Sequence, residues 1–186
     1  MSANTVPAEL EHVRRHAHCL ASAAEIGLAM DRIAARISDD LQDSNPLLLG
    51  VMTGGVVPLS MLIQRLEFPL QVDYVHLTRY GAQTDGGELS WIKRPPAAVR
   101  DRTVLLVDDI LDHGITLAAL AAECIQLGAA RVLTAVLVTK EIGVRSGLAA
   151  ADYSALTLPD AYLFGYGMDY KTYLRNAPGV FAVDTP

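Results

Sequence analysis

Cysteine is scarce in this chain, because Cys19 and Cys124 are the only two among 186 residues. Two cysteines so far apart in the sequence form neither a disulfide framework nor the paired spacing of a structural zinc site. Apolar runs long enough to span a bilayer are missing as well, and the N-terminal stretch MSANTVPAELEHVRRHAH lacks the apolar centre of a secretory signal. We therefore expect a reduced, cytoplasmic setting for the protein.

Positive charge is also in short supply. The chain has 15 Lys and Arg against 21 Asp and Glu, a net charge of −6, which argues against a general binder of nucleic acids or anionic membranes. Hydrophobic residues make up 51% and charged residues 19%, so the chain is expected to be globular. An anionic substrate would therefore need local help from backbone amides, single Lys or Arg residues, or a metal ion.

Apolar periodicity divides the chain into alternating elements. Residues 8–41 are predicted to be helical, with a break between two helices at Gly27. The predicted strands then lie at 47–52, 72–77, 104–107, 132–138, 161–165 and 180–183, and the predicted helices at 56–66 and 115–127. Residues 79–95 carry three glycines and little periodicity, which indicates a mobile loop or an extended β-arm. This alternation predicts one α/β domain, with a mostly parallel sheet that has helices on both faces and binds ligands at the carboxyl ends of its strands.

The stretch VLLVDDILDHGIT, residues 104–116, places three carboxylates at the end of a predicted strand. Asp108 and Asp109 are adjacent, and Asp112 follows in a turn that Gly114 opens toward a helix. Backbone amides in such a turn and the helix dipole favour a bound phosphate. Crowded carboxylates repel one another unless hydroxyl groups or a cation stand between them, and sugar hydroxyls and Mg²⁺ both meet that need. The alternative is a solvated loop in which an aspartate caps a helix.

This stretch is similar to the phosphoribosyl pyrophosphate signature of type I phosphoribosyltransferases. The resemblance implies the fold of that family: a single domain, 1–186, with an N-terminal helical segment over 1–43, a core over 44–158, and a hood built from terminal segments that includes 159–186. It also implies that Asp108 and Asp109 bind the ribose hydroxyls and Mg²⁺. The phosphate loop would consist of Asp112, His113, Gly114, Ile115 and Thr116.

An acid at position 112 resembles the hypoxanthine-guanine branch of this family. There it lies near N7 of the purine, where a carboxylate can exchange a proton as N9 becomes the nucleophile, so Asp112 is the candidate acid/base. Lys140, in the segment VTK at 138–140, looks like the lysine that donates to the purine O6. Its alternative role is that of an ordinary solvated lysine after a strand.

The segment PDAYLFGYGMDYKTYLRN at 159–176 resembles the C-terminal motif of the same branch. The match implies that Tyr162 stacks on the purine and that Leu163 offers it backbone contacts. Asp169 would bind a second Mg²⁺ beside the purine site, and Arg175 would reach the pyrophosphate. The alternative for Tyr162 is a core aromatic without a ligand.

Two further loops follow from the resemblance. Met52-Thr53-Gly54-Gly55 lies where the family has its pyrophosphate loop, and a cis peptide between Met52 and Thr53 is expected there. Many relatives carry lysine at the position of Thr53, so one cation is missing here. Arg79 and Tyr80 begin the region of the flexible catalytic loop and would cover the pyrophosphate and exclude water. The alternative for 79–95 is a surface hairpin without a role.

The resemblance implies a purine salvage enzyme. It would transfer the 5-phosphoribosyl group from phosphoribosyl pyrophosphate to N9 of hypoxanthine or guanine, giving IMP or GMP and pyrophosphate, with Mg²⁺ as cofactor. Relatives of this fold pair or form tetramers, so a homodimer or homotetramer is expected. Two alternatives stay open: a nucleotide-sensing regulator of the same fold, and an enzyme of this fold that prefers xanthine or another base. Asp112 and the negative net charge disfavour the regulator.

Overall fold

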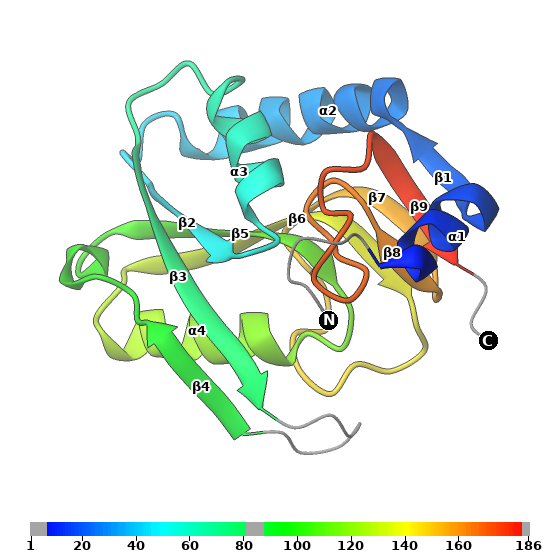
Figure 1. Ribbon diagram of the computed structural model, residues 1–186. Coiled ribbons are helices and arrows are strands. Elements are labelled where there is room, and N and C mark those ends of the chain that lie inside the picture. The colour runs from blue at the N-terminus through cyan, green and yellow to red at the C-terminus, as the bar shows by residue number, and fades with distance from the viewer. Residues whose placement is uncertain (1–6, 81–87, 184–186) are drawn as a thin grey trace.

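A six-stranded sheet forms the centre of the molecule (Figure 1). The computed structural model describes residues 7–80 and 88–183. In sheet order the strands are β4 (Glu88–Lys93), β3 (Gln71–Tyr80), β2 (Leu47–Met52), β5 (Thr103–Leu111), β6 (Arg131–Glu141) and β7 (Tyr153–Pro159). β4 runs antiparallel to β3, and the other neighbours are parallel. The predicted fold class, a mostly parallel sheet flanked by helices, is confirmed.

Helices cover both faces of this sheet, which explains the continuous apolar strands. α2 (Ala23–Leu41) and α3 (Val56–Ile63) lie on one face, and α4 (Ile115–Gln126) lies on the other (Figure 1). Side chains of β5 alternate between two cores: Leu105 and Val107 pack with α2 and α3, whereas Val104 and Leu106 pack with α4. A short 3-10 helix, Ala97–Val99, closes the second core. Burial on both faces therefore orients the strand whose carboxyl end carries the acidic residues.

A smaller antiparallel sheet joins the two ends of the described chain. Its order is β1 (His18–Ser22), β9 (Gly179–Val183) and β8 (Tyr162–Phe164), and α1 (Ala8–His16) lies beside it (Figure 1). The predicted strands at 161–165 and 180–183 are thus present as β8 and β9. Terminal segments build this second layer, as expected of a hood.

The N-terminal prediction is partly wrong. Residues 8–41 are not helical throughout, because β1 separates α1 from α2, and Gly27 lies within α2 instead of breaking it. α2 begins after Ser22, which forms a capping box with Glu25: the Ser22 amide donates to the Glu25 carboxylate at 2.8 Å. The strand pairs with β9 from the far end of the sequence, so a local pattern does not reveal it.

Two other regions differ from the prediction. β7 was not predicted; it is an edge strand that pairs only with β6 among the described strands, and it lacks a long apolar run. The β-arm interpretation holds for the ends of the 79–95 region, where β3 and β4 pair, while residues 81–87 lie outside the described residues.

No helix within 7–80 or 88–183 combines the length and hydropathy that crossing a membrane requires.

Candidate active site

The adjacent acids lie near the carboxyl end of β5, inside a strand that runs to Leu111, further than expected. The extension follows from pairing with the long strand β6, which continues to Leu111 opposite Thr139. Asp108 and Asp109 are each only 8% exposed. The Asp109 amide donates to Asp108 Oδ1 at 2.9 Å, which fixes the two carboxylates relative to each other.

Two glycines pack directly against this acid pair. A Cβ atom at Gly54, in the turn after β2, would lie 1.9 Å from Asp109 Oδ2. Gly167, from the segment after β8, has a φ of 108°, and a Cβ atom there would lie 2.2 Å from the Gly54 carbonyl oxygen. Three segments distant in sequence therefore meet with no room for side chains. The peptide bond between Met52 and Thr53 is cis, as expected, and the Thr53 side chain is exposed in the turn.

Burial dominates the electrostatics of the acid pair. It raises the pKa of Asp108 well above the ordinary value, and the neighbouring Asp109 charge adds to the effect. Burial also raises the pKa of Asp109. Arg175 Nη1 lies 4.0 Å from Asp109 Oδ2, and Arg175 Nη2 lies 2.7 Å from Asp169 Oδ1. Burial therefore outweighs the effect of the Arg175 charge on both carboxyl groups.

The turn at 112–116 lies beside the acid pair and is held from the loop between β6 and β7. Gly114 has a φ of 75° and caps the N-terminus of α4. The Gly147 amide donates to the His113 carbonyl at 2.9 Å, and the Leu148 amide donates to the Gly114 carbonyl at 3.0 Å. A pocket in this turn is lined by Asp108, Asp109, Ile110, Asp112, His113, Gly114, Ile115 and Thr116. The predicted phosphate loop thus forms one concave surface with the acids, and the His113 side chain is exposed at its rim.

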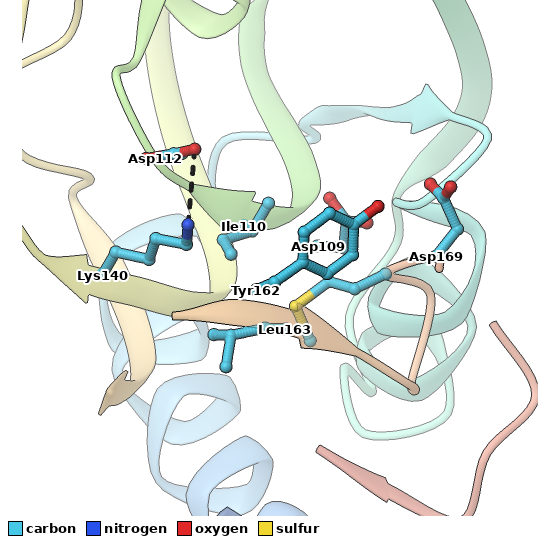
Figure 2. A pocket seen from close by; sticks show the side chains of 8 residues that line it. Asp109, Ile110, Asp112, Lys140, Tyr162, Leu163 and Asp169 are labelled. Atoms are coloured by element: carbon cyan, nitrogen blue, oxygen red, sulfur yellow. Dashed lines mark ion pairs between the residues drawn. The ribbon is translucent and has the colours of Figure 1, made fainter. Parts of the chain in front are cut away.

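A second pocket of about 250 Å³ shares part of this lining (Figure 2). Its residues are Asp109, Ile110, Asp112, Lys140, Tyr162, Leu163, Met168 and Asp169. Lys140 Nζ lies 3.6 Å from Asp112 Oδ2 and 3.2 Å from Asp160 Oδ1, and the lysine side chain is only 13% exposed. Figure 2 shows the Asp112–Lys140 ion pair at one end of the pocket and Asp169 at the other.

Most of the residues selected from the sequence therefore gather at one edge of the sheet. Arg79 and Tyr80 belong to the end of β3, but their side chains lie outside the described residues. Sequence reasoning missed Gly167 and Asp160, although both lie inside the quoted segment 159–176. A glycine at position 167 is itself a sequence signal for a positive φ. The Asp160–Lys140 contact joins the end of β7 to β6, and no local sequence pattern indicates it.

Comparison with known proteins agrees with this geometry. The family model of the phosphoribosyl transferase domain matches residues 19–171. The chain belongs to the phosphoribosyltransferase family. This phosphoribosyltransferase is 31% identical over 160 residues to the hypoxanthine-guanine phosphoribosyltransferase of Bacillus subtilis (strain 168), a match that covers 86% of this chain and 88% of that protein. It is 30% identical over 146 residues to the hypoxanthine-guanine-xanthine phosphoribosyltransferase of Tritrichomonas foetus, covering 78% of this chain and 80% of that one.

Solved structures show the same architecture for this phosphoribosyltransferase. A hypoxanthine phosphoribosyltransferase from Staphylococcus aureus aligns with a TM-score of 0.86, over 98% of this chain and 97% of that one. The two sequences are 24% identical, so the likeness demonstrates a shared fold. In this phosphoribosyltransferase, α1 lies before the segment that the family model matches.

Proposed function

We propose that this phosphoribosyltransferase transfers the 5-phosphoribosyl group of phosphoribosyl pyrophosphate to N9 of hypoxanthine or guanine, giving IMP or GMP and pyrophosphate. One observation carries the proposal: the pocket of the 112–116 turn and the pocket that contains Lys140 share Asp109, Ile110 and Asp112. A sugar phosphate in the first would therefore present its reacting carbon to a flat base in the second. The names of the Bacillus and Tritrichomonas relatives support 6-oxopurines as the bases.

The sugar phosphate is bound by the turn and the acid pair in this proposal. Amides of 113–116 and the N-terminus of α4 bind the 5′-phosphate, with Ile115 and Thr116 at the helix start. Asp108 and Asp109 accept hydrogen bonds from the ribose hydroxyls. Thr53 and Gly54 contact the pyrophosphate through their backbone, and Arg175 contacts it through its guanidinium group.

The purine occupies the Lys140 pocket. Lys140 donates to O6, Tyr162 stacks on the ring, and the backbone of Leu163 contacts the base edge; Tyr162 is 42% exposed and lines the pocket. Asp112 takes up the proton of N7 as N9 attacks the sugar carbon. Positive charge that develops on the ribose is stabilised by the nearby carboxylates, and Arg79 and Tyr80 are proposed to exclude water.

The acid pair fits Mg²⁺ as cofactor. Within 7–80 and 88–183, no group of three or more His, Cys, Asp and Glu is arranged to hold a metal by itself, so substrate oxygens would complete the coordination. Burial raises the pKa values of Asp108 and Asp109 although Arg175 lies within 4.0 Å of Asp109, so a bound cation would stabilise the charged form of both carboxylates. Asp108 and Asp109 would hold one ion and Asp169 a second. When bound, Mg²⁺ neutralises the departing pyrophosphate.

A spectrophotometric assay tests the proposal. Purified protein is mixed with Mg²⁺, phosphoribosyl pyrophosphate and one of four bases: hypoxanthine, guanine, xanthine or adenine. We expect turnover with hypoxanthine and guanine and very little with adenine. Turnover with adenine alone, or with none of the four, would refute the proposal, and a preference for xanthine would reassign the base.

The oligomeric state and the domain division complete the proposal. We propose that residues 1–186 form a single domain that assembles as a homodimer or homotetramer. Light scattering of the purified chain measures the assembly directly. A mass equal to that of one chain would refute the proposed homodimer or homotetramer and leave the proposed reaction untouched.

A further inference from the structure

Arg145 connects three pieces of backbone around the purine pocket. It lies in the loop between β6 and β7 and is half-buried. Its Nε donates to the Asp112 carbonyl at 2.8 Å, its Nη1 donates to the Ala149 carbonyl at 3.2 Å, and its Nη2 donates to the Lys140 carbonyl. All three contacts are with main-chain oxygens, so the planar guanidinium group links the backbones of these segments at fixed distances.

Two of those segments carry the side chains that face the purine. Asp112 follows β5 and Lys140 lies near the end of β6, and their charged groups are 3.6 Å apart. An ion pair with one half-exposed member is weak by itself, because water screens it and both side chains can rotate. A planar guanidinium bonded to both carbonyls sets the separation of the two backbones, which the flexible side chains do not do.

The remainder of the phosphate loop has separate support. The Gly147 and Leu148 amides bind the His113 and Gly114 carbonyls through backbone hydrogen bonds that do not include the Arg145 guanidinium group. Removing the guanidinium group would therefore loosen Asp112 relative to Lys140 and leave the amides of the phosphate turn in place.

We propose that Arg145 is a positioning residue that fixes the Asp112–Lys140 pair and thereby sets affinity and selectivity for the 6-oxopurine base. The inference rests on the proposed function. The lining of the purine pocket includes Asp112 and Lys140 but not Arg145. Its effect reaches the base only through the backbones that it connects.

Steady-state kinetics of Arg145→Gln tests the proposal. We expect KM for hypoxanthine to rise about tenfold, since a factor of ten corresponds to one strong hydrogen bond, while KM for phosphoribosyl pyrophosphate changes by about twofold or less. The ratio of kcat/KM for hypoxanthine to that for adenine should fall. Arg145→Lys should resemble Arg145→Gln, because one ammonium group does not reproduce a fork that reaches three carbonyls.

Arg102→Gln provides a matched control. Arg102 also binds a main-chain carbonyl, that of Asn45, at 2.6 Å, but it precedes β5 and so lies at the opposite edge of the sheet. Its loss should leave both KM values unchanged. Both substitutions remove an arginine that binds main-chain carbonyls, so both can lower Tm. Measuring Tm for each variant therefore shows whether a change in KM reflects lost positioning of the Asp112–Lys140 pair or a general loss of stability.

The outcomes are distinguishable from those of the proposed function. Wild-type protein that uses neither hypoxanthine nor guanine refutes the function itself. If the wild type uses them but Arg145→Gln keeps the wild-type KM and base selectivity, the positioning role is refuted. The positioning role is also refuted if both KM values rise equally and Tm falls. It is refuted as well if Arg145→Lys has the wild-type KM for hypoxanthine and the wild-type base selectivity.

Discussion

The two sides of the site are fixed in place by different kinds of contact. We call one the acidic-pair side, which consists of Gly54, Asp108, Asp109 and Gly167. The other is the lysine side, which consists of Asp112, Lys140 and Asp160. On the acidic-pair side, glycine backbones pack against a buried carboxylate, and no space remains for a side chain at Gly54 or Gly167. On the lysine side, one cation lies between two partly exposed acids, and an arginine outside the pocket holds the backbones.

We propose that the acidic-pair side performs the constant task of binding the sugar phosphate and that the lysine side performs the selective task of choosing the base. A sugar phosphate with a fixed shape suits a surface made by close packing, because packed interiors deform little. Discrimination among purines depends on the position of a few hydrogen-bonding groups, which polar contacts can tune at small cost in stability. The following experiments test whether the two sides respond in these different ways.

The largest expected effect is that of Asp112→Asn on the lysine side. Loss of the proposed acid/base group should lower kcat by between about 10²- and 10⁴-fold, with the Kd of phosphoribosyl pyrophosphate nearly unchanged. Single-turnover kinetics and equilibrium binding measure the two quantities. Asp160→Asn is the matched control, since it removes the other carboxylate beside Lys140 at 3.2 Å and should cost far less. Similar kcat values for the two variants would contradict the assignment of Asp112.

Gly54→Ala should have the next largest effect, on the acidic-pair side. The new methyl group would overlap Asp109 Oδ2, and displacement of the carboxylate should lower kcat/KM for phosphoribosyl pyrophosphate by about 10²-fold. Gly27→Ala is the control: its methyl group meets nothing within 4 Å, and alanine favours the interior of α2. Wild-type kinetics for Gly54→Ala would show that this side adjusts after all.

Lys140→Ala should produce a smaller and selective effect. We expect kcat/KM for hypoxanthine to fall by about tenfold to thirtyfold, because the proposed charged donor to O6 is lost, whereas the low activity with adenine should stay the same. Competition between hypoxanthine and adenine measures the change in selectivity. A variant that discriminates against adenine as well as the wild type does would remove Lys140 from its role.

Asp108→Asn should have the smallest effect, on stability. The raised pKa of Asp108 means that the folded protein binds a proton that the unfolded chain has already lost. Its contribution to the free energy of unfolding therefore declines as pH rises from the ordinary value of 3.8 through the folded pKa. Without substrate, and at a pH high enough to ionise Asp108 in the folded wild type, the variant should unfold roughly 3–6 °C above the wild type, because it avoids the cost of a buried charge.

The stability gap should narrow as the pH is lowered, because the wild-type carboxyl then becomes neutral in the folded protein. Thermal unfolding over a pH series that begins near the ordinary value of 3.8 and rises to alkaline pH measures the gap. Asp39→Asn, at an exposed position of α2, should change Tm little at any pH. A gap that is constant across this range would contradict the burial of a charge at Asp108.

Several features of the site could be predicted because they arise from neighbouring residues. The apolar runs of β2, β5 and β6 indicated buried parallel strands, and the residues 112–116 indicated a turn that opens a helix. The cis bond before Thr53 was expected from the family motif. β1 and β7 were not predicted, since one pairs with the far end of the chain and the other is an edge strand.

By itself, the sequence determined the parallel core and the acidic turn, because apolar periodicity and turn chemistry act over a few residues. Only the tertiary structure decided that Gly167 lies on Gly54, that Asp160 lies beside Lys140, and that Arg145 connects the backbones of Asp112 and Lys140. These contacts join segments that the packing of the two cores and the small terminal sheet brings together. Their distances therefore depend on the whole fold, and no short stretch of residues specifies them.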